Sequence, residues 1–189
     1  MKEYILIFLS VIFADNILFT KMLGLEFTLA LRKEKELSRI FWVITIAVSA
    51  LTSVGAQILG EKGVGTIVCA VLFAVVGVVC GCVFDIVFKN TKASKTFATA
   101  LAMNTAFLGI AFAMSSAEGT MNALVVGSSH GVGLMLSALM VNCIEERVKY
   151  SRPPKLLGKT LLTLLCIAVV AMAFSAFDGF ELRYENINS

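Results

Sequence analysis

The sequence predicts an all-α integral membrane protein with six transmembrane helices. Hydrophobic residues make up 58% of the 189 residues, charged residues only 15%, and the mean hydropathy is +0.89. The charges lie in short clusters between apolar runs, and those runs reach the roughly 20 residues that a membrane-spanning helix needs. Two prolines and a mostly aliphatic composition favour helices over a barrel, whose strands alternate every second residue. A soluble globular protein is excluded.

Six apolar runs predict the spans, with approximate bounds of 3–22, 40–60, 64–88, 96–116, 120–144 and 157–178. Thirteen of the 16 Lys and Arg residues lie in or beside the loops after the first, third and fifth spans, leaving only Lys2, Lys62 and Arg183 on the other side. By the positive-inside rule we expect those three loops in the cytoplasm and both termini outside. We expect the first run to be kept as a span, because no small-residue cleavage site follows it.

The first apolar run is unusually long and contains polar residues. It continues from Tyr4 to Leu31, interrupted by Asp15 and Asn16 and later by Gly24 and Glu26. A straight helix of that length would measure about 42 Å against a core of about 30 Å, and each charge costs roughly 2.5–3.5 kcal/mol at bilayer depth. A segment that is broken within the membrane into half-helices fits this pattern. A normal span that ends near Thr20 fits it too.

Two short motifs recur at similar offsets. Asn16-x-x-Phe19 returns as Asn104-x-x-Phe107, and Phe84-Asp85 returns as Phe177-Asp178. Three spans per repeat is an odd number, so the two halves would enter the membrane with opposite topology. We therefore predict one integral membrane domain, 1–189, built from inverted three-helix repeats of about 1–92 and 93–189. The first and fourth segments are predicted to be broken.

Five polar residues are candidates for an ion path: Asp15, Asn16, Glu26, Asn104 and His130. Intramembrane Glu26 could carry a proton or bind a cation, or it could pair with a nearby lysine at the interface. Asp15 and Asn16 could orient ligands at a helix break, or they could hydrogen-bond to a neighbouring span. His130 could relay a proton or bind a metal, but the surrounding glycines also suit close helix packing.

Other sites are not indicated. The five cysteines lie in apolar runs, where packing explains them better than a disulfide framework or metal ligation, although the role of Cys80 and Cys82 stays open. The sequence lacks a phosphate loop, a nucleophile elbow, a zinc motif and a covalent-flavin signature. The basic residues lack interleaved aromatic platforms, so we expect a lipid bilayer and no nucleic acid around the chain. At most the chain is a non-catalytic subunit.

A set of motifs in a fixed order resembles the Rnf/Nqr family of six-helix membrane subunits. The matching residues are Glu3-Tyr4-Ile-Leu-Ile-Phe, Asn16, Leu23-Gly24-Leu25, Asn104-x-x-x-Leu108-Gly109, Gly127, Gly133, Ile144-x-Glu146-Arg147 and Ala173-Phe174-x-x-Phe177-x-Gly179. The resemblance covers nearly the whole chain, and the outside N-terminus resembles the A-type member of the Rnf pair. It implies a prokaryotic inner membrane, a homologous membrane subunit as partner in a homo- or heterodimer, and possible contact with other oxidoreductase subunits. Asn104 is then expected to maintain the broken fourth segment.

The resemblance also implies a 2Fe–2S cluster between two such subunits, and here the chain departs from the family. The positions that match the cluster cysteines hold Glu26 and Thr105. Clusters are held by thiolates, and a carboxylate or hydroxyl is a hard oxygen donor. We therefore expect no cofactor on this chain. The leading hypothesis is a scaffold or ion-path subunit of an ion-translocating electron-transfer complex. The alternative is a small inverted-repeat transporter that has lost the redox role.

Overall fold

The computed structural model describes residues 2–25, 28, 38–62, 105–114, 119–151 and 158–177, with isolated positions between 67 and 86. Every regular element in these ranges is helical. The helices are α1 (Lys2–Phe13), α2 (Ile17–Lys21), α4 (Ser38–Glu61), α7 (Thr105–Met114), α8 (Thr120–Tyr150) and α9 (Lys159–Ser175). The all-α prediction is confirmed for this part of the chain.

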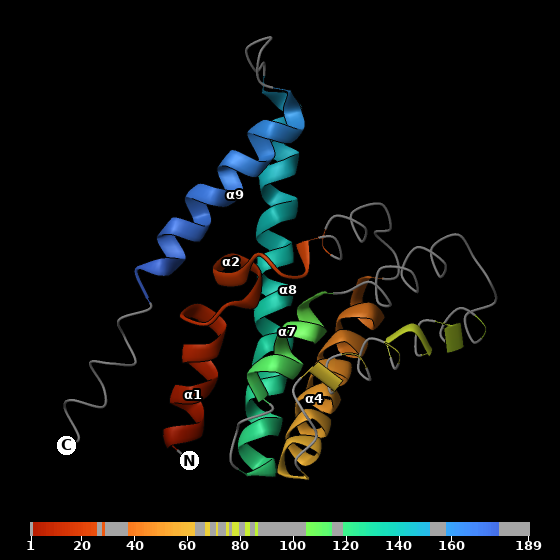
Figure 1. The fold of residues 1–189 in the computed structure, drawn as a ribbon. Coiled ribbons are helices and arrows are strands. Elements are labelled where there is room, and N and C mark those ends of the chain that lie inside the picture. Colours follow the sequence, from red (N-terminus) through yellow and green to blue (C-terminus); the bar gives the residue numbers. More distant parts are fainter. Residues whose placement is uncertain are drawn as a thin grey trace.

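The 31-residue helix α8 is the central helix, against which other helices pack (Figure 1). Helices α1 and α4 pack along the half that begins at Thr120, and α9 packs along the half that ends at Tyr150. Helix α4 carries four buried small polar residues, Thr45, Ser49, Thr52 and Ser53, and of these Ser49 and Ser53 face α8. Gly127 and Gly131 of α8 face them, because a Cβ on either glycine would meet Ser53 or Ser49. Small residues let two membrane helices approach closely.

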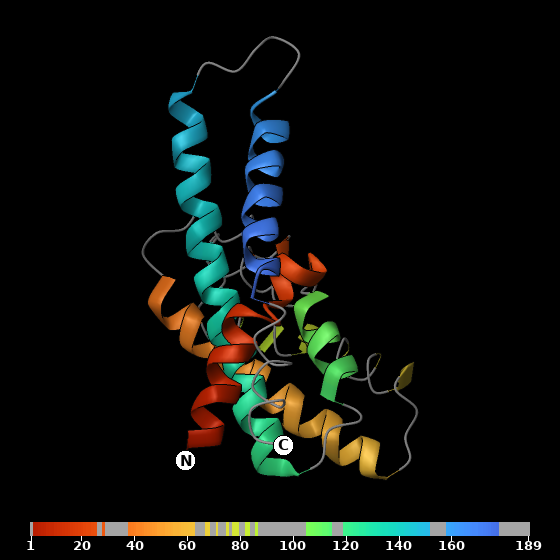
Figure 2. The ribbon, with the colours of Figure 1, turned by 90° about the vertical axis from the view of Figure 1, so that its left-hand side faces the viewer.

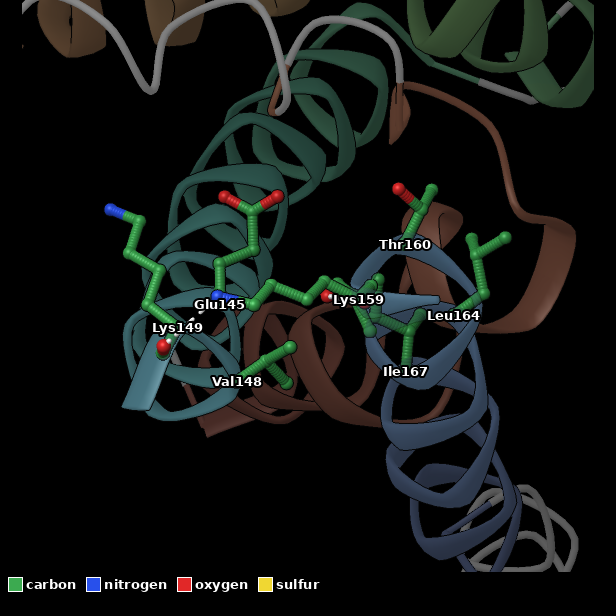
Figure 3. A pocket seen from close by; sticks show the side chains of 8 residues that line it. Glu145, Val148, Lys149, Lys159, Thr160, Leu164 and Ile167 are labelled. Atoms are coloured by element: carbon green, nitrogen blue, oxygen red, sulfur yellow. Dashed lines mark hydrogen bonds between the residues drawn. The ribbon is translucent and has the colours of Figure 1, made fainter. Parts of the chain in front are cut away.

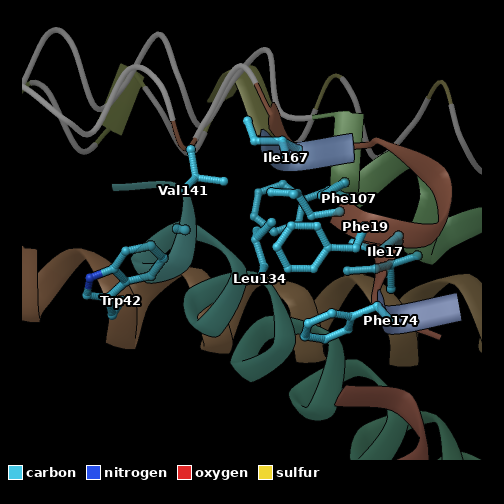
Figure 4. Close-up of a cluster of buried hydrophobic side chains, with 12 residues drawn as sticks. Ile17, Phe19, Trp42, Phe107, Leu134, Val141, Ile167 and Phe174 are labelled. Carbon is cyan, nitrogen blue, oxygen red and sulfur yellow. The ribbon is translucent and has the colours of Figure 1, made fainter. Parts of the chain in front are cut away.

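Helices α1 and α9 follow one another along α8, with α2 at their junction (Figures 1 and 2). Aromatic rings connect the three helices there. The Phe174 ring of α9 lies 4.6 Å from the Phe19 ring of α2 and 6.3 Å from the Phe13 ring of α1, measured between centroids. Figure 4 shows Phe174 and Phe19 within the buried cluster, beside Leu134 of α8 and Phe107 of α7. The core thus forms around the junction.

The helices agree with the predicted spans where the structure describes them. Within the described ranges, three stretches are long and apolar enough to cross a membrane, namely Tyr4–Lys21, Trp42–Glu61 and Thr120–Tyr150, and Lys159–Ser175 is a shorter apolar helix. The first segment is divided between α1 and α2, as the half-helix interpretation expects. Helix α8 extends six residues beyond the predicted limit of 144, because hydropathy falls at Glu145 while good helix formers continue.

Most of the predicted span 64–88, and residues 96–104 of the fourth, lie outside the described residues. The six-helix inverted repeat therefore remains a prediction.

Candidate functional site

The candidate site is the break between α1 and α2, and its backbone geometry follows from two residues. Helix α1 ends where the amides of Ala14 and Asp15 both donate to the Ser10 carbonyl, at 2.7 and 3.2 Å. Asn16 then adopts an extended conformation, with φ −65° and ψ 107°, and caps α2. Asn is among the preferred N-cap residues because its side-chain oxygen accepts from free amides of the first turn. The polar pair thus stops one helix and starts the next.

Both polar atoms of the Asn16 side-chain amide form hydrogen bonds. Its Oδ1 accepts from the amides of Leu18 and Phe19 at 3.2 and 3.4 Å. Its Nδ2 donates to the carbonyls of Ile12 at 2.9 Å and Gly133 at 3.3 Å. The side chain is fully buried, and it therefore satisfies the backbone groups that the break releases.

Helix α8 holds this asparagine in place. The Ser137 hydroxyl donates to Asn16 Oδ1 at 2.8 Å and is also 2.8 Å from the Gly133 carbonyl of its own helix. A Cβ on Gly133 would lie 3.5 Å from Asn16 Nδ2, an ordinary van der Waals contact, so α1 and α8 meet here without requiring a glycine. His130, Gly133 and Ser137 lie on one face of α8, because residues three and seven apart share a side of a helix. This face is directed at the break.

Three ionisable side chains lie at the same break. Lys21 Nζ is 2.9 Å from Asp15 Oδ1, and both side chains are about two-fifths exposed, at 42% and 40%. His130 Nε2 is 3.9 Å from the other oxygen, Asp15 Oδ2, and the imidazole is only 1% exposed. The Asp15 carboxylate therefore lies between an exposed ammonium and a buried imidazole.

The chain leaves α2 through a tight turn that contacts the start of α7. Met22 adopts the left-handed conformation, with φ 55°, which is uncommon for a residue other than glycine. Gly24 has φ 87°, and its amide donates to Thr105 Oγ1 at 2.9 Å. Gly109 of α7 faces the same turn, because a Cβ there would lie 2.5 Å from Leu23 Cδ1. A side chain at position 109 would require the Leu23 side chain to shift.

The residues singled out from the sequence fall at two places. Asp15, Asn16 and His130 meet at the helix break, and Thr105 lies at the turn beyond α2. Glu26 and Asn104 lie outside the described residues, as does Cys80. Of the other cysteines described, Cys82 and Cys143 are exposed and Cys166 is half-buried. In the described ranges, no three His, Cys, Asp or Glu side chains gather as a metal site would require.

Sequence reasoning missed the contribution of Ser137. It lies 121 residues from Asn16, and a serine in an apolar helix is an ordinary residue. One signal was available: Ser137 is seven residues beyond His130 and four beyond Gly133, so the three share a helix face. That pattern does not reveal which helix the face meets.

A second feature is a cavity of about 350 Å³ between the last turns of α8 and the first turns of α9 (Figure 3). Glu145, Lys149 and Lys159 contribute charged groups to its lining, and Val148, Leu164 and Ile167 contribute apolar ones. Lys159 Nζ donates to the Lys149 carbonyl at 3.2 Å and so connects the two helices. The cavity lies at the basic end of the helix pair, and Ile167 of its lining also belongs to the buried cluster around α2.

The comparison with known families identifies the chain's relatives. The chain matches the Rnf-Nqr subunit family, described as a membrane protein, over residues 4–181. It belongs to this family. The break, the turn and the cavity are therefore features of an Rnf-Nqr subunit.

Curated relatives of this Rnf-Nqr subunit include the E subunit of the Na(+)-translocating NADH-quinone reductase of Psychromonas ingrahamii. It is 27% identical over 202 residues, which cover 96% of this chain and 100% of that protein. The E subunit of the same reductase in Haemophilus influenzae strain PittEE is 25% identical over 198 residues, with coverage of 96% and 100%. The E subunit from Neisseria meningitidis is 34% identical over 83 residues, which cover 43% of this chain and 42% of that one.

Proposed function

We propose that the chain is a membrane subunit of an ion-translocating electron-transfer complex, the kind of assembly that the names of its relatives describe. The supporting observation is the extent of the match: the alignment with the Psychromonas ingrahamii protein covers 96% of this chain and 100% of that one. The chain would then take the place of a whole subunit, beside a homologous membrane subunit and other oxidoreductase subunits. Its expected location is a prokaryotic inner membrane, with both termini outside.

Within the complex, the chain acts as a scaffold with an ion path at the helix break and holds no iron–sulfur cluster of its own. Thr105, at one family ligand position, carries a hydroxyl that accepts a hydrogen bond from the Gly24 amide. That hydroxyl stabilises the turn that precedes Glu26, the other ligand position. Oxygen donors of this kind are poor ligands for sulfide-bridged iron.

Purification from native membranes tests the assignment to a complex. The tagged chain, extracted in mild detergent, should retain a homologous membrane subunit and flavin- or NADH-dependent subunits that mass spectrometry identifies. A chain that purifies alone, or only with copies of itself, would contradict the proposal and favour the transporter alternative.

Substitution at the two family positions tests the claim about the cluster. The complex that carries Glu26→Ala with Thr105→Ala should contain the same iron per complex as the unmodified one, and its electron paramagnetic resonance spectrum should be unchanged. The loss of two irons together with a 2Fe–2S signal would show that these positions hold a cluster. Thr105→Ser alone serves as the control, since it retains the hydroxyl.

A further inference from the structure

His130 is a buried side chain whose polar atoms are unused. It is the only histidine in the sequence. Within the described part of the chain, neither Nδ1 nor Nε2 forms a hydrogen bond, although the residue is only 1% exposed. A buried polar atom without a partner costs about 1–3 kcal/mol. Such a group therefore requires an explanation other than packing.

The surroundings of His130 contain one acid within reach. Asp15 Oδ2 lies 3.9 Å from Nε2, and Lys21 pairs with the other oxygen of that carboxylate. Helix α4 packs on the neighbouring face of α8, where Ile46, Ser49 and Ser53 approach the glycines beside His130. None of these three residues titrates. Among the described residues, Asp15 and Lys21 are thus the charged groups that face the imidazole.

The distance between His130 Nε2 and Asp15 Oδ2 suits a hydrogen bond that forms only transiently. A distance of 3.9 Å exceeds the 2.7–3.2 Å of an N–H···O hydrogen bond, so the two groups are not bonded in this arrangement. The Asp15 side chain is 40% exposed whereas the imidazole is buried, so the carboxylate is the partner that is freer to move and close this gap. Catalytic hydrogen bonds are often similarly long in resting structures.

The side chains that the structure describes at the break do not form a shell for a metal cation. Hard cations need about six oxygen ligands. Asp15 Oδ1 already faces the Lys21 ammonium, and Asn16 Oδ1 already accepts from the Ser137 hydroxyl. The imidazole contributes nitrogen rather than oxygen. A proton needs no such shell, because a single acceptor atom can hold it.

We propose that His130 and Asp15 form a proton-transfer site at the α1–α2 break. In the step, the Nε2–H bond of the imidazolium breaks as an O–H bond forms on Asp15 Oδ2, leaving a neutral imidazole and a carboxylic acid. The reverse step restores both groups, and no electrons are exchanged. The site connects the buried face of α8 with the partly exposed carboxylate. Its contribution to ion translocation rests on the proposed function above.

Hydrogen exchange at the imidazole tests the site directly. The full chain is labelled with 15N-histidine and placed in lipid nanodiscs, where the single histidine gives an unambiguous NMR signal. Exchange of the ring N–H with deuterated water is then measured. Asp15→Asn should slow it by roughly a hundredfold, the lower end of the contribution of a positioned acid–base group. Ser128→Ala, whose hydroxyl donates to the Val125 carbonyl of its own helix and makes no contact with the break, should leave it unchanged.

Further results of the same measurement support or overturn the proposed proton-transfer site. Asp15→Glu retains a carboxylate and should keep the exchange rate within about tenfold of the unmodified chain, which covers the case in which Asp15→Asn does not fold. Exchange equally fast with and without a carboxylate at position 15 overturns the proposal, as does an N–H that is fully protected in the unmodified chain. The measurement needs no partner subunits. A chain that purifies alone would therefore contradict the proposed function while leaving this result standing.

Discussion

Asn16→Ala removes the side chain that holds the helix break together. An N-cap substitution costs about 1 kcal/mol, and interhelical hydrogen bonds in membrane proteins average about 0.6 kcal/mol each. Asn16 caps α2 and makes two bonds to α8, through the Gly133 carbonyl and the Ser137 hydroxyl. We therefore expect a loss of about 2 kcal/mol, or roughly 30-fold in the folding equilibrium.

Thermal unfolding of the purified chain in detergent measures this loss. A loss of about 2 kcal/mol should lower Tm by about 4–8 °C in a protein of this size. Ser128→Ala is the matched control, because the Ser128 hydroxyl donates only to the Val125 carbonyl of its own helix. A double-mutant cycle with Ser137→Ala should give a coupling energy of at least about 0.5 kcal/mol. If Asn16→Ala costs no more than Ser128→Ala, the break is not stabilised by this asparagine.

Three further substitutions test the turn and the helix interface, each by the change in Tm. Thr105→Val removes the acceptor of the Gly24 amide and should cost about 1 kcal/mol, whereas Thr105→Ser should not. Gly24→Ala should cost about 1 kcal/mol or more because φ is 87°, while Gly158→Ala, at φ −60° with open space around it, should be neutral. Gly131→Ala should cost about 1–3 kcal/mol by driving a Cβ into α4, and Gly133→Ala, with contacts of 3.5 Å or more, much less. Equal costs within either glycine pair would contradict the packing described.

The sequence allows the break but does not indicate what holds it. Asp15 and Asn16 stand within an apolar run that is too long for a straight span, so a helix break is one of the two interpretations that the sequence allows, beside a normal span that ends near Thr20. The partners of Asn16 on α8 are more than a hundred residues away, and local pattern carries no information about such pairs. The same limit applies to His130, whose proximity to Asp15 depends on how α1 packs against α8.

For the turn after α2, too, the sequence identifies a residue of interest but not the residue that it contacts. The sequence singles out Thr105 through the family resemblance, as a position that lacks the expected cysteine. Its hydrogen bond to the Gly24 amide follows from the packing of α7 against α2, which no local motif specifies. The observed end of α8 differs from the predicted end at residue 144 for a simpler reason. Hydropathy reports where the membrane ends, but α8 continues to Tyr150 because its charged residues remain good helix formers.

The stacking of α1 and α9 along α8 has a consequence for biosynthesis. Helix α1 has 12 residues, about 18 Å of helix, which is too short to cross a bilayer by itself. The groups that cover its inner end come from Gly133, Ser137 and Phe174, all translated after more than two thirds of the chain. The ribosome therefore delivers the first segment long before its partners exist. The contacts that α8 and α9 make with the break in the folded chain can therefore form only after more than two thirds of the chain has been made.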